Sequence, residues 1–279
     1  MKNLSIKMYM NGKELSPEWI EVKELERTHH VIREMDSLGA DFTYKGKSIS
    51  AQELLQLPFS QVKEALIETK LALGSQKILE LYADRLAESD QMWHDISKNS
   101  VKGRNLQAAY VDVDVDGLTL GDFFAFNQGL NKMGDQALPF KIHPEHFVFA
   151  GVHGGQEVME LIGEYGQPTY QKIFISLDAE KPVVPDADTK ISMAGDTATL
   201  MSDPSLDIKM YGMHQFKMKK GGLRIKLGVF FPEAAPSEMV LGHQEHLAVE
   251  FFNSLTIAYQ NKTFKGKLLN TLLKFKKFK

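Results

Sequence analysis

Hydrophobic and polar positions are weakly patterned over residues 1–50 and follow a helical period after Ser50. Apolar residues recur at helical spacing after Ser50, and Ile78, Leu79, Tyr82 and Leu86 form one apolar stripe. The pattern predicts helices over residues 51–57, 60–73 and 75–95, preceded by a short strand over 4–10 and a turn at Asn11-Gly12. We therefore expect a smaller, mainly helical N-terminal domain that, together with a polar linker, spans residues 1–104.

Strand patterns dominate the next part of the chain. Strict alternation from Tyr110 to Val115 predicts a strand that ends at Asp116-Gly117, and a helix is expected from Thr119, an N-cap candidate, to Gly134. Further strands are expected over residues 147–152, 158–162, 170–177, 190–193, 197–201, 206–219 and 223–231, before a long helix over 236–259. This order favours an α+β fold of the helix-grip or Bet v 1-like type, with a curved antiparallel sheet around a long C-terminal helix, over residues 105–260.

The last segment, residues 261–279, is basic and amphipathic. It contains seven lysines and no acidic residue, interleaved with Leu268, Leu269, Leu272, Leu273 and Phe275. Two interpretations fit this pattern: a surface helix that touches anionic lipid, or a terminal helix that packs on its own domain.

Composition narrows the classes of function. A chain of 279 residues with 43% hydrophobic content can bury a large core, and a net charge of -3 argues against a general nucleic-acid binder. The absence of cysteine excludes a thiolate site, so any metal must be held by histidine and carboxylate. The first residues lack the apolar run of a signal peptide or membrane span, so we expect a cytoplasmic protein without stable membrane insertion.

The long C-terminal helix carries the strongest candidate chemistry. His243, His246 and Glu250 fall at i, i+3 and i+7 and therefore share one helix face. His246 and Glu250 lie one turn apart, where an imidazole nitrogen and a carboxylate oxygen can reach the same metal ion. The competing interpretation is a buried pair that is simply hydrogen-bonded.

Two further candidates precede this helix. His143 and His146 flank Pro144 and Glu145 at the start of a predicted strand. Glu160 stands among apolar residues; on a strand it faces the core and needs a partner, whereas a helix over 156–165 places it on a solvated face. Four nitrogen and oxygen ligands from His146, Glu160, His246 and Glu250 make a plausible zinc site.

Several segments resemble the 2,4-diacetylphloroglucinol hydrolase family, zinc-dependent carbon–carbon bond hydrolases with a Bet v 1-like catalytic domain. The resemblance covers roughly residues 108 to 260 and rests on these segments: VDVDGLTLGDFFAF (113–126), FKIHPEH (140–146), VMELIG (158–163), MHQFKMKKGGLRIKLGVFF (213–231) and HLAVEFFNSLTIAYQ (246–260). This chain differs from the family pattern in three ways: the HP segment is one residue shorter, Phe140 replaces a tyrosine, and Phe123 and Phe124 replace the paired tryptophans of the aromatic helix.

The resemblance implies a role for each matching residue. It assigns the zinc ligands to His146, Glu160, His246 and Glu250, although His143 takes the first place if the gap falls elsewhere. It implies substrate contacts from His214, Phe140 and Phe123, and leaves His214 or His243 as the catalytic proton donor. It also implies a homodimer formed through the N-terminal helices.

Two functions follow. The first is a zinc hydrolase that cleaves a carbon–carbon bond in a small acylated phenolic or diketone-like compound, using zinc-activated water. The alternative is a non-catalytic Bet v 1/START-like protein that binds a hydrophobic or aromatic small molecule.

Overall fold

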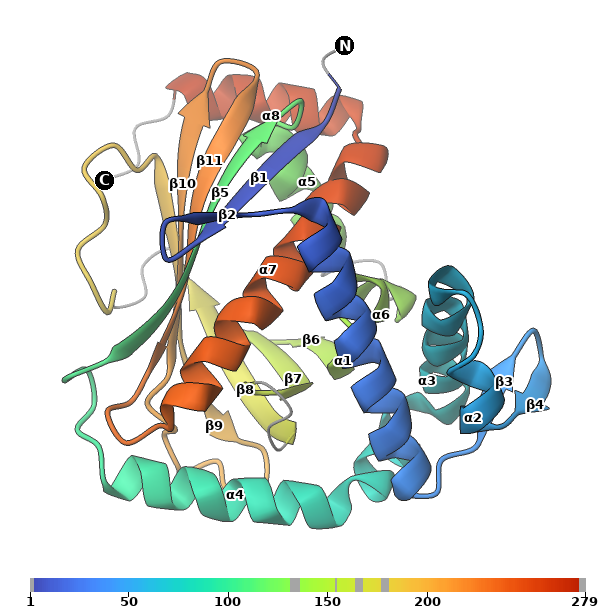
Figure 1. Ribbon diagram of the computed structural model, residues 1–279. Helices are drawn as coiled ribbons and strands as arrows, with labels where there is room; N and C mark the ends of the chain where they lie inside the picture. The colour runs from blue at the N-terminus through green and yellow to red at the C-terminus, as the bar shows by residue number, and fades with distance from the viewer. Residues whose placement is uncertain (1–2, 131–135, 154, 164–167, 177–180, 276–279) are drawn as a thin grey trace.

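The computed structural model describes residues 3–130, 136–153, 155–163, 168–176 and 181–275 (Figure 1). In these ranges the helices are α1 (Pro17–Ser37), α2 (Ala51–Leu54), α3 (Phe59–Leu81), α4 (Ala83–Lys98), α5 (Leu120–Leu130), α6 (Ala137–Ile142), α7 (Ser237–Gln260) and α8 (Phe264–Phe275). The main sheet contains β1 (Ser5–Met10), β2 (Lys13–Leu15), β5 (Gln107–Asp116), β6 (His146–Val152), β7 (Gly155–Leu161), β8 (Pro168–Ser176), β9 (Ile191–Leu200), β10 (Tyr211–Lys219) and β11 (Gly222–Phe231). A separate hairpin pairs β3 (Phe42–Tyr44) with β4 (Lys47–Ile49).

One antiparallel sheet and one long helix organise the molecule. The nine strands run in the order β2-β1-β5-β11-β10-β9-β8-β7-β6. α7 crosses one face of this sheet (Figure 1). The predicted α+β class, with an antiparallel sheet followed by C-terminal helices, is confirmed.

The alternation in β5 explains how the sheet separates core from solvent. Val111, Val113 and Val115 are buried in the main core with Leu247 and Leu255 of α7. On the opposite face Asp114 pairs with Lys219 and Arg224. A period of two therefore places aliphatic groups under α7 and charged groups outside.

The N-terminal segment contributes strands to the main sheet and helices to a second core. β1 pairs with β5 from Ser5↔Asp116 to Tyr9↔Asp112, so the main sheet includes strands from both sides of that position. A second core joins α1, α2 and α3 to the sheet, because Phe147, Val148, Met159 and Leu161 of β6 and β7 belong to it.

Several predicted elements differ from the structure. The region over 1–50 contains a long helix, α1, that the weak apolar pattern did not predict; Ser16 caps it by accepting a hydrogen bond from Trp19 N (3.1 Å). The break expected between 73 and 75 is a kink inside α3 at Gly74 (φ 71°). The two strands expected over 190–193 and 197–201 form one strand, β9. The helix expected to reach Gly134 is described only to Leu130.

Candidate metal centre

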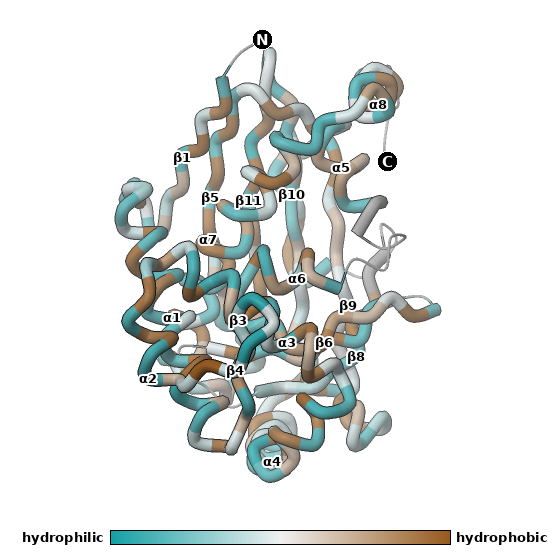
Figure 2. Tube along the Cα trace, turned by 90° about the vertical axis from the view of Figure 1, so that its right-hand side faces the viewer, coloured by the Kyte–Doolittle hydropathy of each residue, from teal (hydrophilic) through white to brown (hydrophobic). Residues whose placement is uncertain are grey.

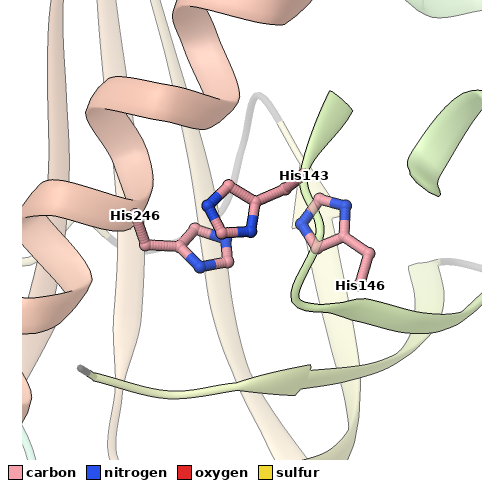
Figure 3. Close-up of side chains that lie close together, drawn as sticks. All are labelled: His143, His146 and His246. Carbon is pink, nitrogen blue, oxygen red and sulfur yellow. The ribbon is translucent and has the colours of Figure 1, made fainter. Parts of the chain in front are cut away.

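Three histidines meet where α6, β6 and α7 come together (Figure 3). His143 follows α6, His146 begins β6, and His246 lies in the middle of α7. All three are buried, and each offers a nitrogen within 4.8 Å of the nitrogens of the other two. The His143 and His246 rings stack with centroids 3.6 Å apart. Such a group can hold a metal ion.

The ring orientations of His146 and His246 are fixed by their Nδ1 atoms. His146 Nδ1 donates to Pro139 O (3.0 Å), and His246 Nδ1 donates to Glu145 Oε2 (2.9 Å). Burial lowers the pKa of His146 to about 3 and that of His246 well below its usual value, so both rings are neutral. Each Nε2 therefore carries a lone pair, the arrangement that metal-binding histidines adopt.

Glu160 lies beside the imidazole nitrogens of His146 and His246. It is the cross-strand partner of His146, and its Oε2 lies 3.6 Å from His146 Nε2 and 3.5 Å from His246 Nε2. Ligand atoms about 2.0–2.1 Å from a tetrahedral zinc ion are about 3.3 Å from one another. The two distances from Glu160 Oε2 to the imidazole nitrogens are therefore close to the distance between neighbouring ligand atoms around a tetrahedral zinc ion.

Two carboxyl groups, those of the buried Glu160 and the partly buried Glu250, lack a compensating cation. Burial raises the pKa of Glu160 to about 8, with Glu250 and Glu145 adding to the rise, and burial raises the pKa of Glu250 to about 7. In the described part of the chain, no lysine or arginine opposes either rise. Only Gln171 Nε2 donates to Glu160 Oε1 (3.2 Å). A divalent cation would balance both carboxylates.

His143 is oriented differently from the other two rings. Its Nδ1 accepts a hydrogen bond from the backbone N of Glu145 (3.1 Å), so the neutral ring carries its proton on Nε2. Burial lowers the pKa of His143 well below its usual value. In this tautomer the Nε2 atom of His143 carries a proton and offers no lone pair to a metal ion.

An arginine from the N-terminal helix α1 supports the ring of His246. Arg27 donates to Glu145 Oε2 through NH1 (2.6 Å) and to Gly242 O through NH2 (2.7 Å). The same Glu145 oxygen accepts the hydrogen bond from His246 Nδ1. Arg27 and Glu145 are both almost fully buried. Burial raises the pKa of Glu145, and Arg27 opposes that rise.

A lysine from α3 fixes the turn that carries His146. Lys70 Nζ donates to Pro144 O and to His146 O (2.8 Å) and lies 4.3 Å from the Phe147 ring centroid. It is almost fully buried, and burial lowers its pKa to about 7. Two helices of the N-terminal segment therefore each contribute a buried basic residue behind the histidine cluster.

The residues expected to contact substrate or donate protons lie in two places. His243 stacks on His246 with ring centroids 5.0 Å apart. His214 lies on β10, where its ring meets Phe251 edge-on at 5.1 Å, and Phe251 in turn packs on Phe123 at 6.3 Å. Phe140 instead lies on the side of α6 near Lys70 Nζ, 5.4 Å from the ring centroid. The structure thus groups His214 with Phe123 and separates Phe140 from them.

Arg27, Lys70 and Glu145 were not predicted from the sequence. Glu145 lies between His143 and His146, and its position inside that segment is a signal that points to it. No local pattern marks Arg27 or Lys70, which are ordinary charged residues of helical segments. Their burial depends on contacts between positions 118 and 76 residues apart in the chain.

Comparisons with known proteins give only distant similarity. No protein-family model matches the chain, and no curated protein matches it. The crystal structure of Ara h 8.0201 is similar with a TM-score of 0.37 and 17% identity, covering 56% of this chain and 100% of that one. A solution structure of a protein from Arthrobacter aurescens has a TM-score of 0.27 and 8% identity, covering 61% of this chain and 91% of the other.

Proposed function

We propose that this chain is a zinc-dependent hydrolase that cleaves a carbon–carbon bond in a small acylated phenolic or diketone-like compound. The observation that carries the proposal is the position of Glu160 Oε2, 3.6 and 3.5 Å from two imidazole Nε2 atoms whose rings are fixed through Nδ1. Zinc would be held by His146, Glu160 and His246, with Glu250 one helical turn after His246 as the fourth ligand.

The donor set fits zinc better than a harder cation. Two neutral imidazoles and two carboxylates are typical of zinc, whereas calcium and magnesium favour oxygen ligands alone. Bound there, zinc would supply Lewis-acid activation of water and of an acyl carbonyl group. We further propose that residues 107–260 have a Bet v 1-like fold. Its support is the order of seven antiparallel strands, β5 to β11, followed by α7.

Residues of the chain would position the substrate and supply the proton. His214 Nδ1 accepts from the backbone N of Gly228 (3.4 Å), so its neutral ring holds a proton at Nε2, and burial lowers its pKa to about 4. That proton would pass to the leaving carbon and would be replaced by the proton that the attacking water loses, so the ring ends neutral. Phe251 meets this ring edge-on, and Phe123 packs on Phe251. His243 is the second candidate donor.

A hydrolysis assay tests this proposal. The zinc-loaded chain is incubated with a panel of acylated phenols and 1,3-diketones, and release of the carboxylic acid is measured. We expect turnover of at least one compound, lost in Glu160→Gln, and reduced in His214→Gln, which keeps its metal. Glu64→Gln, an exposed substitution on α3, is the control. Stoichiometric binding of these compounds without any turnover would instead favour the ligand-binding alternative.

A further inference from the structure

The C-terminal helix α8 is held firmly by one side. Leu273 is buried, and Leu269 packs against the main core. The backbones of α5 and α8 approach closely at Gly121 and Gly266, where no larger side chain would fit. A Cβ on Gly121 would lie 2.4 Å from Gly266 O, and a Cβ on Gly266 would lie 2.9 Å from Asp122 Cα. This side of α8 is therefore fixed against α5.

The opposite side of α8 exposes an apolar stripe. Phe264 and Phe275 are 81% and 83% exposed, and Leu268 and Leu272 are 53% and 58% exposed. At about 100° per residue, these four side chains fall within about 80° of the helix circumference. Figure 2 shows α8 at the upper margin of the molecule, with both hydrophobic and hydrophilic positions in it. The stripe is thus presented outward by a helix that is already anchored.

Lysines border this stripe on both sides. On the same helical projection, Lys265 lies about 20° beyond one edge, and Lys267 and Lys274 lie about 60° and 80° beyond the other, past Thr271; all three lysines are exposed. Residues 261–279 contain seven lysines and no acidic residue. An apolar stripe between rows of lysines is complementary to a surface with negative headgroups above hydrocarbon, because the lysine stems can extend beside the inserted side chains.

We propose that α8 is a peripheral docking helix for a membrane surface that contains anionic phospholipid. The four apolar side chains insert at the boundary between headgroups and acyl chains, while Lys265, Lys267 and Lys274 contact the headgroups. α8 lies in the plane of the surface and does not cross the bilayer. Accordingly, in the described ranges no helix is long and apolar enough to span a membrane. This inference is independent of the proposed hydrolase activity.

Vesicle co-sedimentation of the full-length chain tests the inference. Vesicles of phosphatidylcholine alone are compared with vesicles that also contain phosphatidylserine. We expect binding that requires phosphatidylserine and weakens with added salt. Lys265→Gln/Lys267→Gln/Lys274→Gln should weaken binding roughly 100-fold, from about fivefold per lysine. The charge-matched control, Lys13→Gln/Lys47→Gln/Lys77→Gln, changes exposed lysines elsewhere and should retain most of the binding.

The apolar stripe is tested separately. Leu268→Ser/Leu272→Ser should abolish vesicle binding without changing the circular dichroism spectrum, because both side chains are exposed. The control Val184→Ser, at another exposed apolar side chain, should leave vesicle binding unchanged. Absence of binding to phosphatidylserine vesicles at low salt overturns the proposal. Equal loss in the control variants also overturns it. Self-association through the stripe without vesicle binding would show that a second copy covers it, and would overturn the proposal as well.

Discussion

Removing the buried charge of Arg27 should destabilise the fold and the histidine cluster together. In Arg27→Met, Glu145 loses the guanidinium that lies 2.6 Å from its Oε2, and Gly242 O loses its donor at 2.7 Å. Breaking a buried ion pair by deleting one partner costs about 3–5 kcal/mol, because the other charge stays buried and unpaired. That is a large part of the roughly 5–15 kcal/mol of stability of a typical domain.

Chemical denaturation of the metal-free chain measures this loss. The double variant Arg27→Met/Glu145→Gln removes both charges, so we expect it to recover at least half of the stability lost in Arg27→Met. The recovery distinguishes an unpaired carboxylate from a simple loss of packing. A loss below about 1 kcal/mol in Arg27→Met, or a double variant no more stable than the single one, would refute the reasoning.

The remaining predictions concern the ligands and their surroundings. Glu145→Gln should weaken zinc binding about 10- to 100-fold, because the hydrogen bond that orients His246 loses its charge; competition with a coloured chelator measures it, and unchanged affinity would contradict the role. The folded-state pKa values of Glu160 and Glu250 are raised to about 8 and about 7. The metal-free fold should therefore lose stability as pH rises through this window, because both carboxyl groups lose their protons. The increase in Tm on adding zinc should grow over the same pH range. Differential scanning calorimetry at pH values from 6 to 8.5 tests this, and a zinc-induced shift that falls with pH would oppose it. Lys70→Met should destabilise the chain by about 1–3 kcal/mol, because the Pro144 and His146 carbonyl groups lose a buried donor; urea denaturation measures this.

Elements with a clear period were predictable from the sequence. The alternation in residues 110–115 gave β5, and the dense apolar pattern after Pro236 gave α7. α1 was missed because nine of its 21 residues are charged and interrupt the apolar pattern. The helix is stabilised by packing of Val31, Ile32 and Met35 in the second core. Local propensity carries little information about such tertiary contacts.

In the candidate site, too, features set by local sequence could be predicted, whereas features set by tertiary contacts could not. The spacing of His246 and Glu250 on one helix face is a local property, so it could be predicted. The meeting of His146 with Glu160 depends on the register of β6 with β7, which the sequence did not specify. Arg27 and Lys70 come from helices far away in the chain, and only the packed structure places them behind the histidines.

Metal content tests the central claim most directly. The purified full-length chain is equilibrated with zinc, freed of excess metal and measured by inductively coupled plasma mass spectrometry. We predict about one zinc ion per chain. This content should fall in His246→Ala and Glu160→Gln and stay unchanged in Glu64→Gln. A fully folded chain that takes up no zinc or other divalent metal would contradict the account.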